Sequence, residues 1–195
     1  RSEAIGATAM QQGFASAASF HSDSASYLGL LPKDQPGMHK VLAEHDLLIV
    51  LGCDGLRTSV ASSVDPMPDG LATIQIGLGD WDIAKNYAVA MAVRADIRQT
   101  LQALTPLLAR KASAGYKART AARLQEIAAR NWTAKRAKLV AGIAARAPAR
   151  PIDVDAFMLE LVSALPDDVV LVHEGFTSTH HLTDLFAFRD RFCFH

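Results

Sequence analysis

The sequence lacks most of the features that mark several protein classes. It contains only two cysteines, Cys53 and Cys193, which lie far apart, outside metal-ligand spacing, and in or beside apolar runs. This pattern argues against a disulfide framework and favours buried thiols in a reducing compartment. No apolar run approaches the roughly 18 residues that cross a bilayer, and the first residues do not resemble a signal peptide. We therefore expect a cytoplasmic protein without a membrane partner.

An excess of charge of either sign is also missing. Twenty Lys and Arg balance twenty Asp and Glu in 195 residues, half of which are hydrophobic. This composition is typical of one large globular domain, or of one and a half. Residues 110–150 depart from the balance, because eleven Lys and Arg face a single acid there, Glu126. Only Tyr116 and Trp132 are aromatic in that segment, so we expect a solvated basic linker helix and no nucleic-acid partner.

Apolar runs and helical patterns alternate along the first two thirds of the chain. Predicted strands lie at residues 7–10, 46–52, 71–77 and 88–93, and a polar loop is predicted at 11–35. The run at 46–52 is continuous and ends in glycine, as in parallel sheets covered on both faces, and the run at 88–93 predicts a further buried strand. Predicted helices begin at Pro36, at an Asp80 cap, and at Ile97 with an apolar face through Leu108. The order predicts a Rossmann-like α/β fold, a parallel sheet flanked by helices, with ligand sites near Gly52 and Gly77.

A second α/β unit is predicted after the segment "APARP" at residues 147–151. Asp153 is expected to cap a helix that turns Phe157, Leu161 and Leu165 toward a core. A strand follows from Val169, and the closing "RFCFH" has the pattern of another. Because the chain starts at Arg1 instead of Met and stops in that pattern, we expect part of a longer protein with a truncated second domain.

Three familiar kinds of site are incomplete in this sequence. "IGLGDWD" has Asp82 where a dinucleotide loop needs its third glycine, so a turn is favoured. Ser178, His180 and Asp184 are residue types of a hydrolase triad, but the glycine-flanked nucleophile turn is missing. His180 and His181 are adjacent and would point about 100° apart on a helix. No metal site is therefore predicted.

A glycine and a cluster of hydroxyl residues follow the strand that begins at Val169. Gly175 allows another group to approach the backbone, and Thr177, Ser178 and Thr179 come next. Such residues either cap the next helix or offer hydroxyl and backbone N–H donors to a phosphate. Taken alone, the residue types favour the simple cap.

The order and spacing of these pieces resembles the superfamily of thiamine-diphosphate-dependent 2-oxo-acid decarboxylases and acetolactate synthases, in particular its benzoylformate decarboxylase-like members. "LAEHDLLIVLGCD" is similar to a strand of the family's central domain. Residues 14–32 resemble a loop of that domain, with His21 in place of a proline. Residues 74–101 resemble its next strands, with Gly77 and Gly79 where relatives carry acids. "PDDVVLVHEGFTSTHHL" resembles the beginning of the diphosphate-binding domain.

The resemblance implies a domain organisation and a set of cofactors. Residues 1–147 would form most of the central domain without its first strand, including a basic linker helix at about 110–147. Residues 148–195 would begin the diphosphate-binding domain. Thiamine diphosphate and magnesium are the implied cofactors, and the diphosphate contacts are Gly175, Phe176, Thr177 and Ser178. The resemblance thus implies that the glycine and hydroxyl cluster forms one half of a phosphate-binding site, which we call the phosphate cradle.

The implied activity is decarboxylation or carboligation of a 2-oxo acid by a homodimer or homotetramer. The family's catalytic glutamate and its magnesium motif have no counterpart in this sequence, so no catalytic residue or metal ligand is assigned. The chain by itself is expected to be inactive. Two alternatives remain open: a free-standing Rossmann-like module that binds ADP or FAD, and a purely structural domain that buries an oligomer surface.

Overall fold

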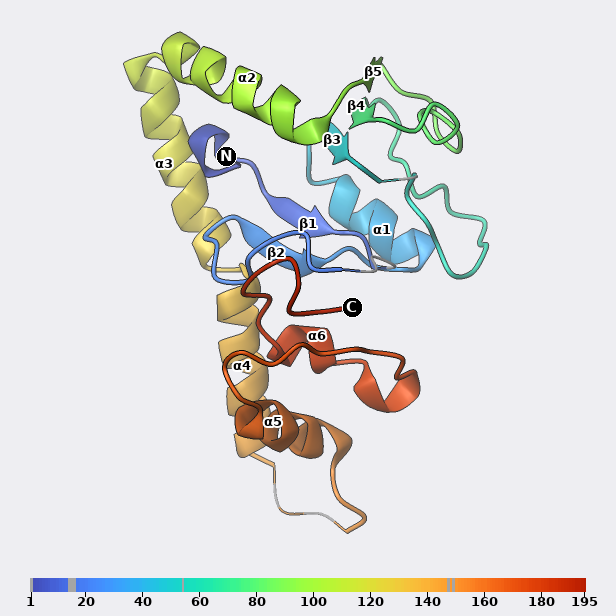
Figure 1. The fold of residues 1–195 in the computed structure, drawn as a ribbon, viewed down its shortest axis with the longest axis vertical. Helices are drawn as coiled ribbons and strands as arrows, with labels where there is room; N and C mark the ends of the chain where they lie inside the picture. Colours follow the sequence, from blue (N-terminus) through green and yellow to red (C-terminus); the bar gives the residue numbers. More distant parts are fainter. Residues whose placement is uncertain (1, 14–16, 54, 147, 149) are drawn as a thin grey trace. The chain divides into compact units, whose positions relative to one another are not determined.

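The computed structural model describes residues 2–13, 17–53, 55–146, 148 and 150–195, drawn as a ribbon in Figure 1. The chain divides into two compact units that interleave in sequence. Unit 1 contains residues 12–13 and Leu31–Ala112, and unit 2 contains residues 2–11, residues 17–30 and Ser113–His195. The predicted domain boundary near residue 147 is a different division of the chain, and it stays a prediction.

Unit 1 is built on a three-stranded parallel sheet with the order β3-β4-β5. Its strands are β3 (Leu47–Leu51), β4 (Ala72–Gly77) and β5 (Met91–Arg94). The register places Ile49 opposite Ile74, and Ile74 opposite Met91. The three strands lie within or beside the apolar runs of the sequence, and their parallel pairing confirms the predicted class of sheet.

Two helices belong to the same unit. Helix α1 (Gln35–Leu42) begins after Asp34, whose carboxylate accepts the N–H of Gly37 at 2.7 Å. Helix α2 (Ile97–Lys111) begins after Asp96, which accepts the N–H of Gln99. The helix predicted at Asp80 is wrong, because residues 80–86 form turns. The N–H groups of Asp82 and Ile83 both donate to the Gly79 carbonyl, so the chain forms a turn there and not a helix.

The sheet of unit 1 is not covered on both faces, so that expectation is wrong. Leu47, Ile49 and Leu51 alternate along β3 and each remains at least 40% exposed, whereas Val50 between them is buried. Met91 on β5 is 55% exposed. Ile76, opposite Leu51 in the register, is buried, so the face that carries Leu47, Ile49 and Leu51 is covered in part.

Unit 2 combines a short parallel pair with most of the helices. Strands β1 (Ala9–Gln11) and β2 (Tyr27–Leu30) pair in parallel. Strand β2 lies inside the segment predicted to be a polar loop. The remaining elements are η1 (Glu3–Ile5), α3 (Ala114–Ala128), α4 (Trp132–Ala144), α5 (Val154–Ala164), η2 (Thr177–Thr179) and α6 (Leu182–Leu185).

The basic segment is helical, as predicted, but it forms more than one helix, and α4 within it packs against the core of unit 2. It breaks between α3 and α4, where Asn131 caps α4 by accepting the N–H of Ala134 at 2.9 Å. Both α5 and α6 lie against α4 (Figure 1). Two of its cations donate to backbone carbonyls, Lys135 to Leu28 and Arg136 to Leu185.

The core of unit 2 forms between α4 and the last forty residues of the chain. Its buried members are Ala18, Tyr27, Trp132, Ile143, Met158, Leu182, Leu185, Phe186, Phe188, Cys193 and Phe194. The two predicted terminal strands meet in a single parallel bridge between Leu171 and Phe194. No helix of the described residues has both the length and the apolar character that a membrane crossing requires.

Candidate functional site

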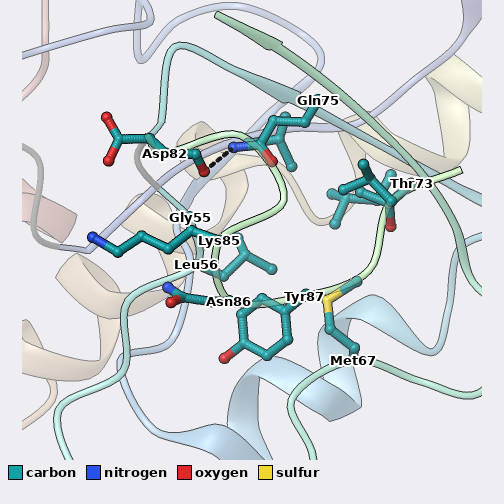
Figure 2. Close-up of a pocket in the computed structure, with 12 residues that line it drawn as sticks. Gly55, Leu56, Met67, Thr73, Gln75, Asp82, Lys85, Asn86 and Tyr87 are labelled. Carbon is teal, nitrogen blue, oxygen red and sulfur yellow. Dashed lines mark hydrogen bonds between the residues drawn. The ribbon is translucent and has the colours of Figure 1, made fainter. Parts of the chain in front are cut away.

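The loops after β3 and β4 are joined by Gln75, a buried side chain on the middle strand. Its amide nitrogen donates to the carbonyls of Cys53 and Asp82 at 3.2 and 3.1 Å, and its oxygen accepts the N–H of Ala84 at 2.8 Å. Figure 2 shows Gln75 and Asp82 joined at one side of the pocket. A buried amide with its donor and acceptor atoms both paired fixes the loops that it bridges.

The cavity beside Gln75 is small. It is lined on the sheet side by residues such as Val50 and Thr73, on the loop side by Lys85 and Tyr87, and encloses about 20 Å³. That volume holds roughly one water molecule. A nucleotide does not fit, so the cavity gives no support to the predicted ADP or FAD.

The glycines near the strand ends have structural explanations. Gly52 follows β3 with φ 64°, a conformation that favours glycine, and a Cβ there would lie 2.5 Å from Cδ1 of Ile97. In "IGLGDWD", the carbonyl of Gly79 accepts the N–H groups of Asp82 and Ile83. A Cβ on Gly79 would lie 2.7 Å from Oδ2 of Asp82. This stretch is the turn that the sequence predicts.

The predicted phosphate cradle lies on the surface of unit 2. Phe176, Thr177 and Ser178 are exposed, Phe176 by 93%. Gly175 is also exposed, and a Cβ on it would overlap the side chain of Thr179. The Thr179 hydroxyl lies 2.8 Å from Nε2 of His173. The group that lies close to Gly175 in this structure is therefore the Thr179 side chain, from the turn that follows it.

The hydroxyl residues do not cap a helix, so the simple interpretation of this cluster is wrong. Thr177 to Thr179 themselves form the one-turn 3-10 helix η2, and Phe176 at its N-cap makes no side-chain cap bond. Helix α6 follows His181, again without a side-chain cap. The exposed hydroxyls of Thr177 and Ser178 are therefore not used as caps.

The two histidines point to different partners. Nδ1 of His180 lies 3.1 Å from the carbonyl oxygen of Thr177, and Nδ1 of His181 lies 3.1 Å from Oδ2 of Asp184. The histidine beside Asp184 is thus His181, and the triad order Ser178, His180, Asp184 is not formed. Neither histidine lies inside a regular helix, because His180 follows η2 and His181 precedes α6.

A carboxylate that the sequence did not connect with these histidines lies beside them. Asp155, in the first turn of α5, has Oδ1 3.8 Å from Nε2 of His180. Arg146 donates to Asp155 at 2.8 Å and to Asp153 at 3.0 Å, and these bonds raise the pKa of the Arg146 guanidinium. The pKa of Asp153 is lowered, first by the N–H of Ala156 that it caps. Sequence spacing gives no signal for this cluster.

Both cysteines are free thiols, as expected. Cys193 is buried in the core of unit 2, and Cys53 lies half-buried beside Gln12 and the carbonyl of Gly55. Burial raises the pKa of the Cys53 thiol. A raised pKa reduces the thiolate fraction and with it the reactivity of the sulfur.

Parallel sheets flanked by helices define an α/β protein of the Rossmann-like type. Within that type, the family model of the thiamine pyrophosphate enzyme central domain matches residues 3–104, just over half of the chain. The chain therefore belongs to the thiamine pyrophosphate enzyme central-domain family. No curated protein matches it.

Three solved structures are similar over the chain, and each shows the fold alone at its level of identity. An enzyme from Mycobacterium smegmatis described as thiamin diphosphate-dependent is 20% identical with a TM-score of 0.72, over 99% of this chain and 34% of its own. A 4-hydroxybenzoylformate decarboxylase from Rhodococcus jostii RHA1, thiamine diphosphate-dependent, is 17% identical with a TM-score of 0.68, over 100% and 33%. Benzoylformate decarboxylase from Polynucleobacter necessarius is 18% identical with a TM-score of 0.69, over 100% and 33%. The chain spans about a third of the length of these structures.

Proposed function

We propose that the chain is part of a longer thiamine-diphosphate-dependent enzyme that decarboxylates or ligates 2-oxo acids. The observation that carries the proposal is the match of the central-domain family to residues 3–104, joined to a fold likeness that extends over the whole chain. Two of the similar structures are named as decarboxylases of benzoylformate or its 4-hydroxy derivative. A 2-oxo acid substrate and a homo-oligomeric enzyme are parts of this proposal.

The segment from Gly175 to Ser178 fits one side of a diphosphate site. Thr177 and Ser178 are exposed and engaged in no cap, so their hydroxyls remain available to phosphate oxygens. Their donors are neutral, and the neighbouring Glu174 is acidic. Such a segment supplies hydrogen bonds but no compensating positive charge. We therefore assign Gly175, Phe176, Thr177 and Ser178 to half of the site.

Magnesium fits this segment less well than the diphosphate does. Mg²⁺ requires an octahedron of oxygen ligands, usually one or two carboxylates with phosphates and waters. Glu174 is the only acid between His173 and His180, and its side chain is exposed. We derive no magnesium ligand from this chain and expect the metal to be held by residues outside it.

In the proposed enzyme, thiamine diphosphate would supply the carbon nucleophile for chemistry at the carbonyl carbon of a 2-oxo acid. The residues of this chain that we assign to the site bind and orient the cofactor. Thr177 and Ser178 would donate hydrogen bonds to the diphosphate. Gly175 has no side chain and so leaves room for the Thr179 side chain of η2. No catalytic residue is assigned here.

The test uses the complete polypeptide that contains this chain, assayed with benzoylformate, thiamine diphosphate and magnesium. We expect cofactor-dependent release of carbon dioxide, and a Thr177→Val variant whose apparent Kd for the cofactor rises by about tenfold, which is the effect of losing one hydrogen bond to a charged group. Thr133→Val, on an exposed position of α4, is the matched control and should leave the Kd unchanged.

The outcomes separate the two parts of the proposal. Cofactor-dependent turnover with an unchanged Kd in Thr177→Val would refute the assignment of the cradle and leave the activity standing. Turnover of no 2-oxo acid, at any cofactor concentration, would refute the activity. Calorimetric titration of the 195-residue chain alone should give no micromolar binding of thiamine diphosphate and magnesium, and such binding would contradict its expected dependence on the rest of the enzyme.

A further inference from the structure

Three potential metal ligands from separate parts of unit 2 come together at one point. Asp155 lies in the first turn of α5, His180 follows η2, and His181 precedes α6. One ligand atom from each residue lies within 4.8 Å of the other two. The imidazole rings of the two histidines have centroids 4.1 Å apart. Adjacent residues achieve this because the backbone bends between η2 and α6.

The carboxylate of Asp155 has one oxygen used and one left over. Oδ2 accepts a hydrogen bond from Arg146 at 2.8 Å. Oδ1 is buried, has no hydrogen-bond partner, and lies 3.8 Å from Nε2 of His180. This separation is too long for a hydrogen bond. It suits two ligands of one ion, since zinc lies about 2.0–2.2 Å from each nitrogen or carboxylate oxygen.

The other ring nitrogens have the partners that metal-bound histidines use. Nδ1 of His180 is placed to donate its hydrogen to the Thr177 carbonyl, and Nδ1 of His181 to the Asp184 carboxylate. With the hydrogen on Nδ1, the lone pair of each imidazole lies on Nε2. Hydrogen bonds of this kind orient the ring and raise the basicity of the ligating nitrogen.

The charge around the cluster favours a cation. Asp155 belongs to the cluster, Asp184 contacts His181, and Asp153 shares the Arg146 guanidinium with Asp155. These three carboxylates outnumber the one guanidinium that contacts two of them. Two imidazoles and one carboxylate suit zinc and similar transition metals, whereas magnesium prefers oxygen ligands only.

From these observations we propose that Asp155, His180 and His181 form a binding site for a transition-metal dication of the zinc class. The ion joins the beginning of α5 to the bend between η2 and α6. Three protein ligands leave a fourth position of a zinc tetrahedron to water or to an exogenous ligand. The site is independent of the proposed activity and of the magnesium that such an activity requires.

The test is calorimetric titration of the 195-residue chain with zinc chloride, with cobalt absorption as a second measurement. We expect saturable binding of one ion per chain, and a Kd raised at least about tenfold in His180→Ala and in His181→Ala. His21→Ala, which removes an exposed histidine of the same unit, is the control and should bind as the unmodified chain does. The visible absorption of bound Co²⁺ should disappear in the two site variants and persist in the control.

A second pair of variants separates ligation from ion pairing. Asp155→Asn and Asp153→Asn each remove one carboxylate from Arg146, but only Asp155 is a proposed ligand. We expect weakened zinc binding in Asp155→Asn and unchanged binding in Asp153→Asn. The proposal is overturned if these two variants and the two histidine variants all bind zinc with the same Kd. It is also overturned if the unmodified chain shows no saturable binding. Zinc binding that a comparable concentration of Mg²⁺ displaces would also overturn it, because the donor set would then be wrong.

Discussion

Trp132 offers the sharpest test of how the basic helices relate to the end of the chain. It is the first residue of α4 and only 5% exposed. Its indole Nε1 donates to the carbonyl of Thr183 at 3.0 Å, and its ring packs in the core of unit 2. A solvated linker helix would leave this side chain free, so substitution distinguishes the two arrangements.

Two substitutions at Trp132 should have graded effects on the free energy of unfolding. Trp132→Ala removes the whole ring from a buried site and should cost about 3–5 kcal/mol. Trp132→Phe keeps an aromatic ring but leaves the partly buried Thr183 carbonyl without its indole donor, which should cost about 1–3 kcal/mol. Trp81→Phe is the matched control because Trp81 is 80% exposed, and it should change stability by less than about 1 kcal/mol.

Urea unfolding gives these values from two signals. Far-UV circular dichroism follows the helices in every variant. In the Trp81→Phe chain, Trp132 is the only tryptophan, so its fluorescence reports on unit 2 alone. The reasoning is refuted if Trp132→Ala costs less than about 1 kcal/mol. A native emission spectrum that matches the urea-unfolded one would refute it equally.

Three further predictions concern unit 1 and the beginning of α5. Gly52→Ala places an alanine at φ 64° and should lower the free energy of unfolding in urea by about 1–2 kcal/mol. Backbone strain is the main cause, because the nearby end of the Ile97 side chain can move away from the new methyl group. A neutral effect would contradict the turn. Gln75→Leu leaves the N–H of Ala84 without its partner and should cost about 2–4 kcal/mol, with faster amide exchange in the loops after β3 and β4; unchanged exchange would show that Gln75 does not hold them. The depressed pKa of Asp153 stabilises the folded state above the ordinary pKa of an Asp, and this contribution is lost as the pH falls through the depressed value. The unmodified chain should therefore lose stability more steeply than Asp153→Asn as the pH falls below the ordinary pKa of an Asp, and parallel curves would argue against the shift.

Some strands and one helix cap of this fold are local properties that the sequence predicts. The runs at 46–52 and 71–77 contain β3 and β4. At 46–52 the reason is local, because a continuous apolar segment ended by glycine has few other stable conformations. Asp153 caps α5 as predicted, through a bond to the N–H of Ala156. Strand β2 was missed because it has four residues, one of them Gly29, between polar segments.

The faces of the helices depend on packing partners, and there the sequence misled. Helix α5 is apolar on more than one side, so two different stripes satisfy the helical period. The predicted stripe contains Phe157 and Leu161, which remain 47% and 39% exposed, while Met158 enters the core. In α2 the apolar stripe is clear, yet none of the helix's residues is buried. Periodicity shows that a face is apolar, but a neighbouring element decides whether that face is covered.

The histidine pair shows the same limit at a candidate site. The prediction against a metal assumed that His180 and His181 share a helix, where neighbours diverge by about 100°. In the structure His181 has φ −95° and ψ 2°, outside the regular helix, and the two rings lie side by side. The third potential ligand, Asp155, lies in α5, and a turn and an extended segment separate that helix from the histidines in the sequence. Zinc titration therefore examines two things at once, because the ligands converge only if α5 and the bend before α6 are placed as described.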